Sequence, residues 1–160
     1  MRSLIFATLL AAGCGGSMFS QRIDAYRATS SSLDAAVDAH GKAAPAATPS
    51  ACAAAMADYA QKAGALVDQM QSMSGGMDQC MSSLGRPDQA DLAAGCSAIR
   101  SELDAHARSG CAAQDPAAEL GRHVAAMKSH TLQEMERLGQ MESMGNGAGS
   151  SMMGGLQGCH

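Results

Sequence analysis

The residues of this sequence whose types suit chemistry are histidine, methionine and cysteine. The chain of 160 residues holds 13 Met, 6 Cys and 5 His, but only 2 Tyr, 2 Phe and no Trp. Thioether and thiolate sulfur are soft ligands that favour Cu(I), and imidazole nitrogen binds copper and zinc. The composition therefore points to transition-metal binding as the first hypothesis for function.

One helical face collects the best candidate ligands. His123, Met127 and His130 are spaced at i, i+4 and i+7, which places them on one side of a helix. His106 precedes them in the chain and can approach from a neighbouring helix. We predict His106, His123, Met127 and His130 as the main metal ligands, with Cu(I) as the metal. The alternative is that these histidines are solvated, or paired along their own helix as Glu119 and His123 are spaced to be.

A second set of soft ligands is rich in sulfur. Met70, Met73 and Met77 share one helical face, and Cys159-His160 end a tail rich in Gly, Ser and Met. We predict these five residues as secondary metal ligands. The alternative for the three methionines is ordinary core packing, because the flexible Met side chain fills irregular gaps between helices.

Two other classes of function lack sequence support. No glycine-rich phosphate loop, nucleophile-elbow motif or convergent pair of carboxylates is present, so we expect no enzymatic activity. The net charge is -4, and no run of Lys or Arg offers a surface for phosphates, so we expect no nucleic-acid partner.

The longest regular pattern in the chain lies between residues 52 and 84. Its positions alternate steps of four and three residues without a slip, which is the stripe of a helix packed along its length. The stripe consists of Cys52, Met56, Tyr59, Ala63, Leu66, Met70, Met73, Met77, Cys80 and Leu84. It predicts a helix that contacts partners over its whole length.

Three further helices are expected around this one. The same spacing recurs from Phe19 to His40 and from Leu92 to Gly110, and Asp115-Pro116 has the composition of a helix start. Strand-forming residues never alternate over a useful length. Short turns then predict an all-α fold, an antiparallel up-down four-helix bundle spanning residues 21–144.

The last helix has a mixed face. Val124, Thr131 and Leu138 lie on one side of its central stripe and His123 and His130 on the other. We expect the apolar side to face the core, which leaves both histidines at the edge of the seam. In the predicted topology His106 and His123 nevertheless share a level, roughly 10 Å from one end of the bundle at about 1.5 Å per residue.

Five cysteines follow Cys14, the first in the chain, and are available for disulfide bonds. The predicted topology brings Cys52 and Cys111 to one end of the bundle and Cys80 and Cys96 to the other. We therefore predict the disulfides Cys52–Cys111 and Cys80–Cys96, each contributing about 2–4 kcal/mol to stability. Ligation of a metal by the thiolates is the alternative.

The N-terminus has the composition of an export signal. Met1-Arg2 carries the positive charge, and Leu4 to Ala12 is a short apolar run. The run is too short to cross a bilayer, which takes about 20 residues. We expect residues 1–13 to be a signal peptide.

The end of this segment reads Leu10-Ala11-Ala12-Gly13-Cys14. It resembles the lipobox of bacterial lipoproteins, although Leu is usual where Ala11 stands. The resemblance covers about the first 16 residues and implies that Cys14 becomes the lipid-carrying N-terminus. Gly15 is not the Asp that signals inner-membrane retention in many such proteins. Cleavage as an ordinary secreted protein near Gly13 or Gly16 is the alternative.

These inferences combine into one hypothesis with one rival. Residues 14–20 form a lipidated tether, 21–144 the bundle and 145–160 a disordered tail. The mature chain also resembles small helical envelope lipoproteins with scattered His, Met and Cys. We expect a non-catalytic protein of the bacterial envelope, anchored by lipid at the periplasmic face of the outer membrane, that binds Cu(I) or another transition metal for sequestration or handover. The rival is a structural or protein-interaction lipoprotein with a Met-rich core, no metal and an unidentified protein partner.

Overall fold

The fold is built from four helices. A computed structural model describes residues 16–43, 48–83 and 91–152 of the chain. Within these ranges lie α1 (Gly16–Lys42), α2 (Pro49–Ser83), α3 (Leu92–Ser109) and α4 (Pro116–Met152), with no strand. The prediction of an all-helical fold with four helices is confirmed.

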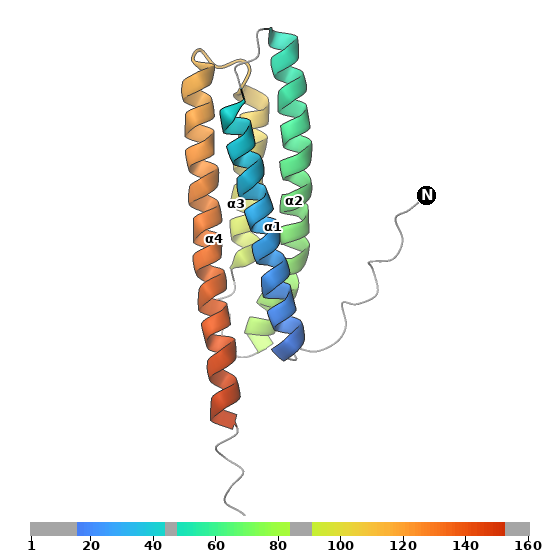
Figure 1. Cartoon of the computed structure of the whole chain (residues 1–160), viewed down its shortest axis with the longest axis vertical. Helices are drawn as coiled ribbons and strands as arrows, with labels where there is room; N and C mark the ends of the chain where they lie inside the picture. Colours follow the sequence, from blue (N-terminus) through green and yellow to red (C-terminus); the bar gives the residue numbers. More distant parts are fainter. Residues whose placement is uncertain (1–15, 44–47, 84–90, 153–160) are drawn as a thin grey trace, which may run out of the picture.

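The helices stand side by side, and each has two neighbours. α1 packs against α2 and α4, and α3 packs against the same two helices. Figure 1 shows the chain running up α1, down α2, up α3 and down α4. The end of α1, the start of α2, the end of α3 and the start of α4 therefore meet at the upper end of the bundle.

Polar side chains fix where two helices begin. The backbone N–H of Ala51 donates to Thr48 Oγ1 at 3.2 Å, just before Pro49 opens α2. At the start of α4, Asp115 Oδ1 accepts from Ala117 N at 3.1 Å and Ala118 N at 3.0 Å. Each cap satisfies first-turn N–H groups that have no partner inside the helix.

The core follows the stripes expected from the sequence. In α2 the side chains of Met56, Tyr59, Met70 and Met77 are buried, and Met73 packs against the core from its edge. The methionine stripe thus lies inside the bundle, packed against apolar side chains of the other helices. This placement fits the core interpretation of these methionines better than the ligand interpretation.

Helix α4 buries a different face from the one expected. His123 and Glu134 have exposed fractions of 0% and 1%, whereas Val124 is only partly buried. The prediction that His123 lies at the edge of the seam is therefore wrong. The physical reason is that polar partners on other helices compensate its burial, so the helix turns a polar stripe inward.

Helix α4 also runs further than expected. The prediction of disorder from residue 145 onward is wrong for 145–152, because α4 continues to Met152. Glycine weakens a helix interior by about 1 kcal/mol relative to Ala. No proline interrupts this stretch, so the helical backbone continues despite its glycines. Residues 153–160, including Cys159 and His160, lie outside the described residues.

The predicted disulfides have different outcomes. Cys52 and Cys111 are bonded, with a Cα–Cα distance of 5.9 Å, as predicted. The pairing of Cys80 with Cys96 is wrong, because Cys96 is a buried free thiol while Cys80 is disulfide-bonded. Cys96 lies inside α3, where its side chain is buried in the core.

Of the N-terminal predictions, the fold contradicts only the tether over residues 16–20, because α1 already begins at Gly16. Residues 1–15, with the signal segment and Cys14, lie outside the described residues. Among the helices that are described, none combines the length and the apolar character needed to cross a membrane.

Candidate functional site

Four rings from four helices meet near the upper end of the bundle. They are His40 of α1, Tyr59 of α2, His106 of α3 and His123 of α4, and we call them the histidine cluster. His40 stacks on Tyr59 with ring centroids 3.9 Å apart, and His106 stacks on His123 at 3.8 Å. The His40 ring stands nearly perpendicular to those of His106 and His123. Each helix therefore supplies one ring to a single compact cluster.

Two imidazole nitrogens of the cluster lie within hydrogen-bond distance of each other. His40 Nε2 lies 3.2 Å from His106 Nε2. One of these atoms can donate to the other when both rings are neutral. Both atoms can instead present lone pairs to a shared cation. The same geometry thus serves a hydrogen bond or a pair of metal ligands.

His123 has a partner on each ring nitrogen. Its Nε2 lies 2.9 Å from the hydroxyl of Tyr59, and its Nδ1 lies 3.0 Å from Glu102 Oε1. Burial raises the pKa of Tyr59 above its ordinary value, so the hydroxyl keeps its proton. The consistent assignment is that Tyr59 donates to Nε2 and that Nδ1–H of His123 donates to Glu102.

Two carboxylates and one guanidinium flank the cluster. Glu119 Oε1 lies 3.6 Å from His106 Nδ1, and Arg122 contacts Glu119 at 2.8 Å and Glu102 at 3.2 Å. Hydrogen bonds from Arg122 lower the pKa of Glu119 to about 2. Partial burial opposes ionisation of Glu102, but hydrogen bonds from His123 and Arg122 outweigh it and lower its pKa. Two ionised carboxylates thus face the Nδ1 atoms of His106 and His123.

The histidines of the cluster are held neutral. Burial lowers the pKa of His40, of His106 and of His123, the last to about 4. Proximity of the rings to one another adds to this effect for His40 and His123. Neutral imidazole has a free lone pair and is the form that binds metals. At neutral pH the cluster is therefore ready to donate lone pairs, and a carboxylate beyond Nδ1 is the usual outer partner of a metal-binding histidine.

A cleft opens beside the cluster. It has a volume of about 720 Å³ and is lined by His40, His106, Met56 and neighbouring apolar side chains. A Cβ atom added at Gly110 would lie 2.6 Å from the Met56 methyl and 3.0 Å from His106 Cε1. The absence of a side chain at Gly110 therefore leaves room for the Met56 methyl and the His106 ring to pack beside the end of α3.

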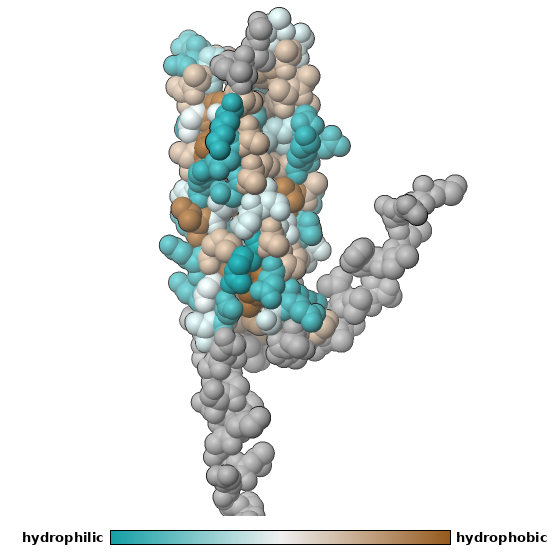
Figure 2. All heavy atoms as spheres, viewed as in Figure 1, coloured by the Kyte–Doolittle hydropathy of each residue, from teal (hydrophilic) through white to brown (hydrophobic). Residues whose placement is uncertain are grey.

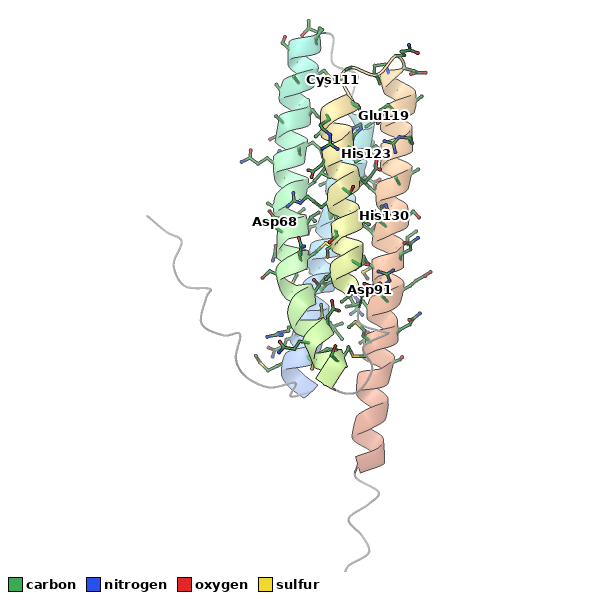
Figure 3. All side chains as sticks on the ribbon, turned by 180° about the vertical axis from the view of Figure 1, so that it is seen from behind. Asp68, Asp91, Cys111, Glu119, His123 and His130 are labelled. Atoms are coloured by element: carbon green, nitrogen blue, oxygen red, sulfur yellow. A yellow bond between two sulfur atoms is a disulfide. The ribbon has the colours of Figure 1, made fainter. Side chains whose placement is uncertain are left out.

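The structure brings together two of the four main ligands that the sequence predicted. His106 and His123 stack, whereas Met127 is fully buried in the hydrophobic core. His130 lies two helical turns beyond His123, about 10 Å along the axis. Figure 3 shows His130 well below His123 on α4. Among the secondary ligands, Met70 and Met77 are buried in the core, and Cys159 and His160 lie outside the described residues.

Sequence reasoning missed His40 and Tyr59 as members of the site. Both residues belong to the predicted stripes of their helices, and a ring at such a position is most simply interpreted as a core side chain. The available signal was positional: His40 ends the first stripe at the bundle end where His106 and His123 also lie. Among the described residues, no three His, Cys, Asp or Glu side chains already converge as ligands of one ion.

A second buried polar group lies toward the middle of the bundle. The Tyr26 hydroxyl donates to Glu134 Oε2 at 2.6 Å and lies 3.2 Å from Cys96 Sγ. Arg137 donates to Glu134 Oε1 at 3.0 Å. Gly95 leaves the room for this carboxylate, because a Cβ there would overlap Glu134 Oε1. We call Tyr26, Cys96, Glu134 and Arg137 the tyrosine–glutamate cluster.

Comparison with known proteins adds no family to these observations. No family model, curated protein or solved structure matches the chain. The functional conclusion therefore rests on the residues themselves.

Proposed function

We propose that this protein binds Cu(I) between His40 and His106, with the thioether of Met56 as a third ligand. The observation that carries the proposal is the 3.2 Å separation of His40 Nε2 and His106 Nε2. Two nitrogens bound at about 2.0–2.1 Å to one tetrahedral ion lie about 3.3 Å apart. The two imidazoles are thus already spaced as neighbouring ligands.

The chemistry of the surrounding groups favours Cu(I) over Zn²⁺. Met56 lines the same cleft as both histidines, and thioether sulfur is a soft ligand that selects Cu(I). Glu119 lies beyond the Nδ1 atom of His106, where an outer carboxylate orients a ligating ring. His123, with both nitrogens hydrogen-bonded, supports the site by stacking on His106.

The cellular role that we propose draws on the lipobox-like segment of the sequence. The lipobox-like residues before Cys14 support a bundle anchored by lipid in the bacterial envelope, after removal of the signal segment. Because α1 begins at Gly16, close after Cys14, an antiparallel up-down bundle anchored there would hold the histidine end away from the membrane. A single Cu(I) site beside an open cleft suits sequestration of the ion or its handover to a partner.

The test is an anaerobic Cu(I) competition titration of the mature protein against a colorimetric chelator. We expect one equivalent bound tightly by the chain from Ser17. His40→Ala and His106→Ala should each weaken binding at least about tenfold, which is 1.4 kcal/mol of binding free energy. His130→Ala is the matched control, because His130 lies on the same bundle but outside the cluster.

A form ending at Met152 separates the cluster from the tail ligands Cys159 and His160. Binding retained in this form assigns the site to the bundle. Unchanged affinity in both His40→Ala and His106→Ala, or loss of binding with the tail, would overturn the proposal.

Two observations favour the rival, a structural bundle without metal. His123 is fully hydrogen-bonded without any ion, and Met70, Met77 and Met127 are buried in the core. In this alternative the hydrogen bonds of the histidine cluster only hold the helices together. The same titration distinguishes the two, because the rival predicts no competition with the chelator in any variant.

A further inference from the structure

A disulfide lies in the wall of the cleft beside the candidate copper site. Cys52 and Cys111 line this cleft together with His40, Met56 and His106. Cys52 precedes Met56 by four residues on α2, a spacing that brings the Cβ atoms of a helix to about 5–6 Å from each other. The disulfide therefore puts sulfur one helical turn away from a proposed copper ligand.

Cys111 approaches the same ligands from just beyond the end of α3. It follows Gly110, whose backbone N–H donates to the carbonyl oxygen of His106 at 2.8 Å. Gly110 also lies beside the methyl group of Met56 and the ring of His106. With a Cα–Cα distance of 5.9 Å, the disulfide ties this point of the chain to the start of α2. Both of its sulfur atoms thus lie at the border of the proposed copper site.

This disulfide is open to attack from solvent. Cys52 and Cys111 are each partly exposed, whereas the free thiol of Cys96 is fully buried. Thiol–disulfide exchange needs access of a thiolate to a sulfur atom, and exposed disulfides are reduced more readily than enclosed structural ones. A dithiol reductant can therefore reach Cys52–Cys111 in the folded bundle.

We propose that reduction of Cys52–Cys111 supplies thiolate to the copper site, so that the redox state of this pair sets the affinity for Cu(I). The inference rests on the proposed function, because the thiolate joins the ligand set of His40, His106 and Met56. Thiolate sulfur is a soft ligand that selects Cu(I), as thioether sulfur is, and it also carries a negative charge that attracts the cation. The reduced protein therefore holds Cu(I) more tightly than the oxidised protein.

The redox step balances with a dithiol as the reductant. The dithiol passes two electrons and two protons to the S–S bond, which breaks into two thiols while the reductant becomes a disulfide. A thiol that then binds Cu(I) gives its proton to water, because the thiolate is the form that ligates metals. Exchange with an oxidising disulfide forms the Cys52–Cys111 bond again. This removes the thiolate ligand and lets the ion leave, still as Cu(I), for an acceptor.

The test is the Cu(I) competition titration described above, carried out on the mature protein in two redox states. Reduced protein is prepared with dithiothreitol, which is then removed anaerobically, and its thiols are counted with a chromogenic disulfide. We expect the tightest site of the reduced protein to bind Cu(I) at least about tenfold more strongly than the oxidised protein does. Equal affinity in the two redox states would overturn the proposal.

Cys52→Ser with Cys111→Ser is the matched control. This double variant lacks the cross-link, as the reduced protein does, but offers no thiolate at these positions, and it keeps every other cysteine. After the same reduction its affinity should not exceed that of the oxidised unmodified protein by more than about twofold. A tenfold gain in the double variant would assign the effect to other thiols or to looser helix ends, and would overturn the proposal.

X-ray absorption at the copper edge gives a readout that needs no variant. In the oxidised protein the proposed ligands are two nitrogens and the sulfur of Met56. Reduction of the unmodified protein should add at least one sulfur neighbour to the ion. The same number of sulfur neighbours in both redox states would contradict the proposal, whatever the folding of the double variant.

The outcomes separate this inference from the proposed function. Cu(I) binding by the oxidised protein, without a gain on reduction, would reject thiolate ligation and keep the site of His40 and His106. Absence of binding by the oxidised protein would reject the proposed function and with it the shared ligand set, even if the reduced protein bound the ion.

Discussion

The histidine cluster and the tyrosine–glutamate cluster both bury polar groups, one with basic side chains and the other with a carboxyl group. Each buries a tyrosine hydroxyl against an ionisable side chain of α4, His123 in one case and Glu134 in the other. The first cluster is built from bases and borders an open cleft, whereas the second holds a carboxyl among buried side chains. Figure 2 shows hydrophilic and hydrophobic residues intermixed on one face of the bundle. The comparison teaches that one bundle can keep two polar interiors with different responses to pH.

The two clusters oppose each other as the pH changes. Burial lowers the pKa of His123 to about 4, so its contribution to stability is present above the unfolded value of about 6.5 and is lost as the pH falls toward 4. Burial raises the pKa of Glu134, so its contribution is present below the unfolded value and is lost as the pH rises through the folded value. Acid therefore weakens the upper cluster and favours the middle one.

Loss of the Cys52–Cys111 disulfide should produce the largest difference between the two clusters. Cys52–Cys111 closes a loop with a sequence separation of 59 beside the cleft, which corresponds to about 4 kcal/mol of stability. We expect Cys52→Ser with Cys111→Ser to lower the free energy of unfolding by about this amount, measured by urea denaturation. Amide exchange should accelerate more around His40 than around Tyr26. Equal acceleration in both places would show that the disulfide does not specifically hold the histidine end.

The acid response of the histidine cluster should be the next largest effect. Between pH 7 and pH 4 the His123 contribution corresponds to a loss on the order of 3 kcal/mol in the free energy of unfolding. His123→Gln removes the ionisable ring and should flatten this part of the stability profile. His130→Gln is the control, because His130 lies outside the cluster. A His123→Gln profile as steep as that of the unmodified protein would contradict the assignment.

Gly95→Ala tests how tightly the middle cluster is packed. The added methyl would overlap Oε1 of Glu134, whose carboxyl group accepts one hydrogen bond on each oxygen, so we expect a loss of about 2 kcal/mol in thermal or urea unfolding. Gly139→Ala is the matched control, since its Cβ meets nothing, and it should stabilise the helix by about 0.5–1 kcal/mol. Stabilisation by Gly95→Ala as well would mean that the Glu134 side chain moves aside freely.

Glu134→Gln should give the smallest effect and the opposite pH trend. The amide oxygen can still accept from the Tyr26 hydroxyl, but the side chain no longer ionises. We expect a change of about 1 kcal/mol or less at pH 5, with the variant gaining stability relative to the unmodified protein as the pH rises to 8. The measurement is urea denaturation across this pH range. A variant that loses relative stability toward pH 8 would show that the ionised carboxylate is favoured by Arg137.

Part of the candidate site was predictable from the sequence. Helical spacing and the expected topology placed His106 and His123 at one level near one end, and the structure brings their rings into contact. The same reasoning grouped His130 and Met127 with them, because i, i+4 and i+7 share a face. A shared face on one helix does not show at which level the side chains of the other helices lie. His130 and Met127 were therefore predicted as ligands although no ligand from another helix lies at their level.

The sequence by itself determined the four helices, the start of the last helix at Asp115, and the Cys52–Cys111 bond. These features depend on local spacing, on first-turn hydrogen bonds and on the meeting of helix ends. Only the tertiary structure decided that α4 turns His123 and Glu134 inward. Their burial depends on hydroxyl groups 64 and 108 residues away, at Tyr59 and Tyr26. Without these partners the same side chains would belong at the surface, since an unpaired buried polar group is costly.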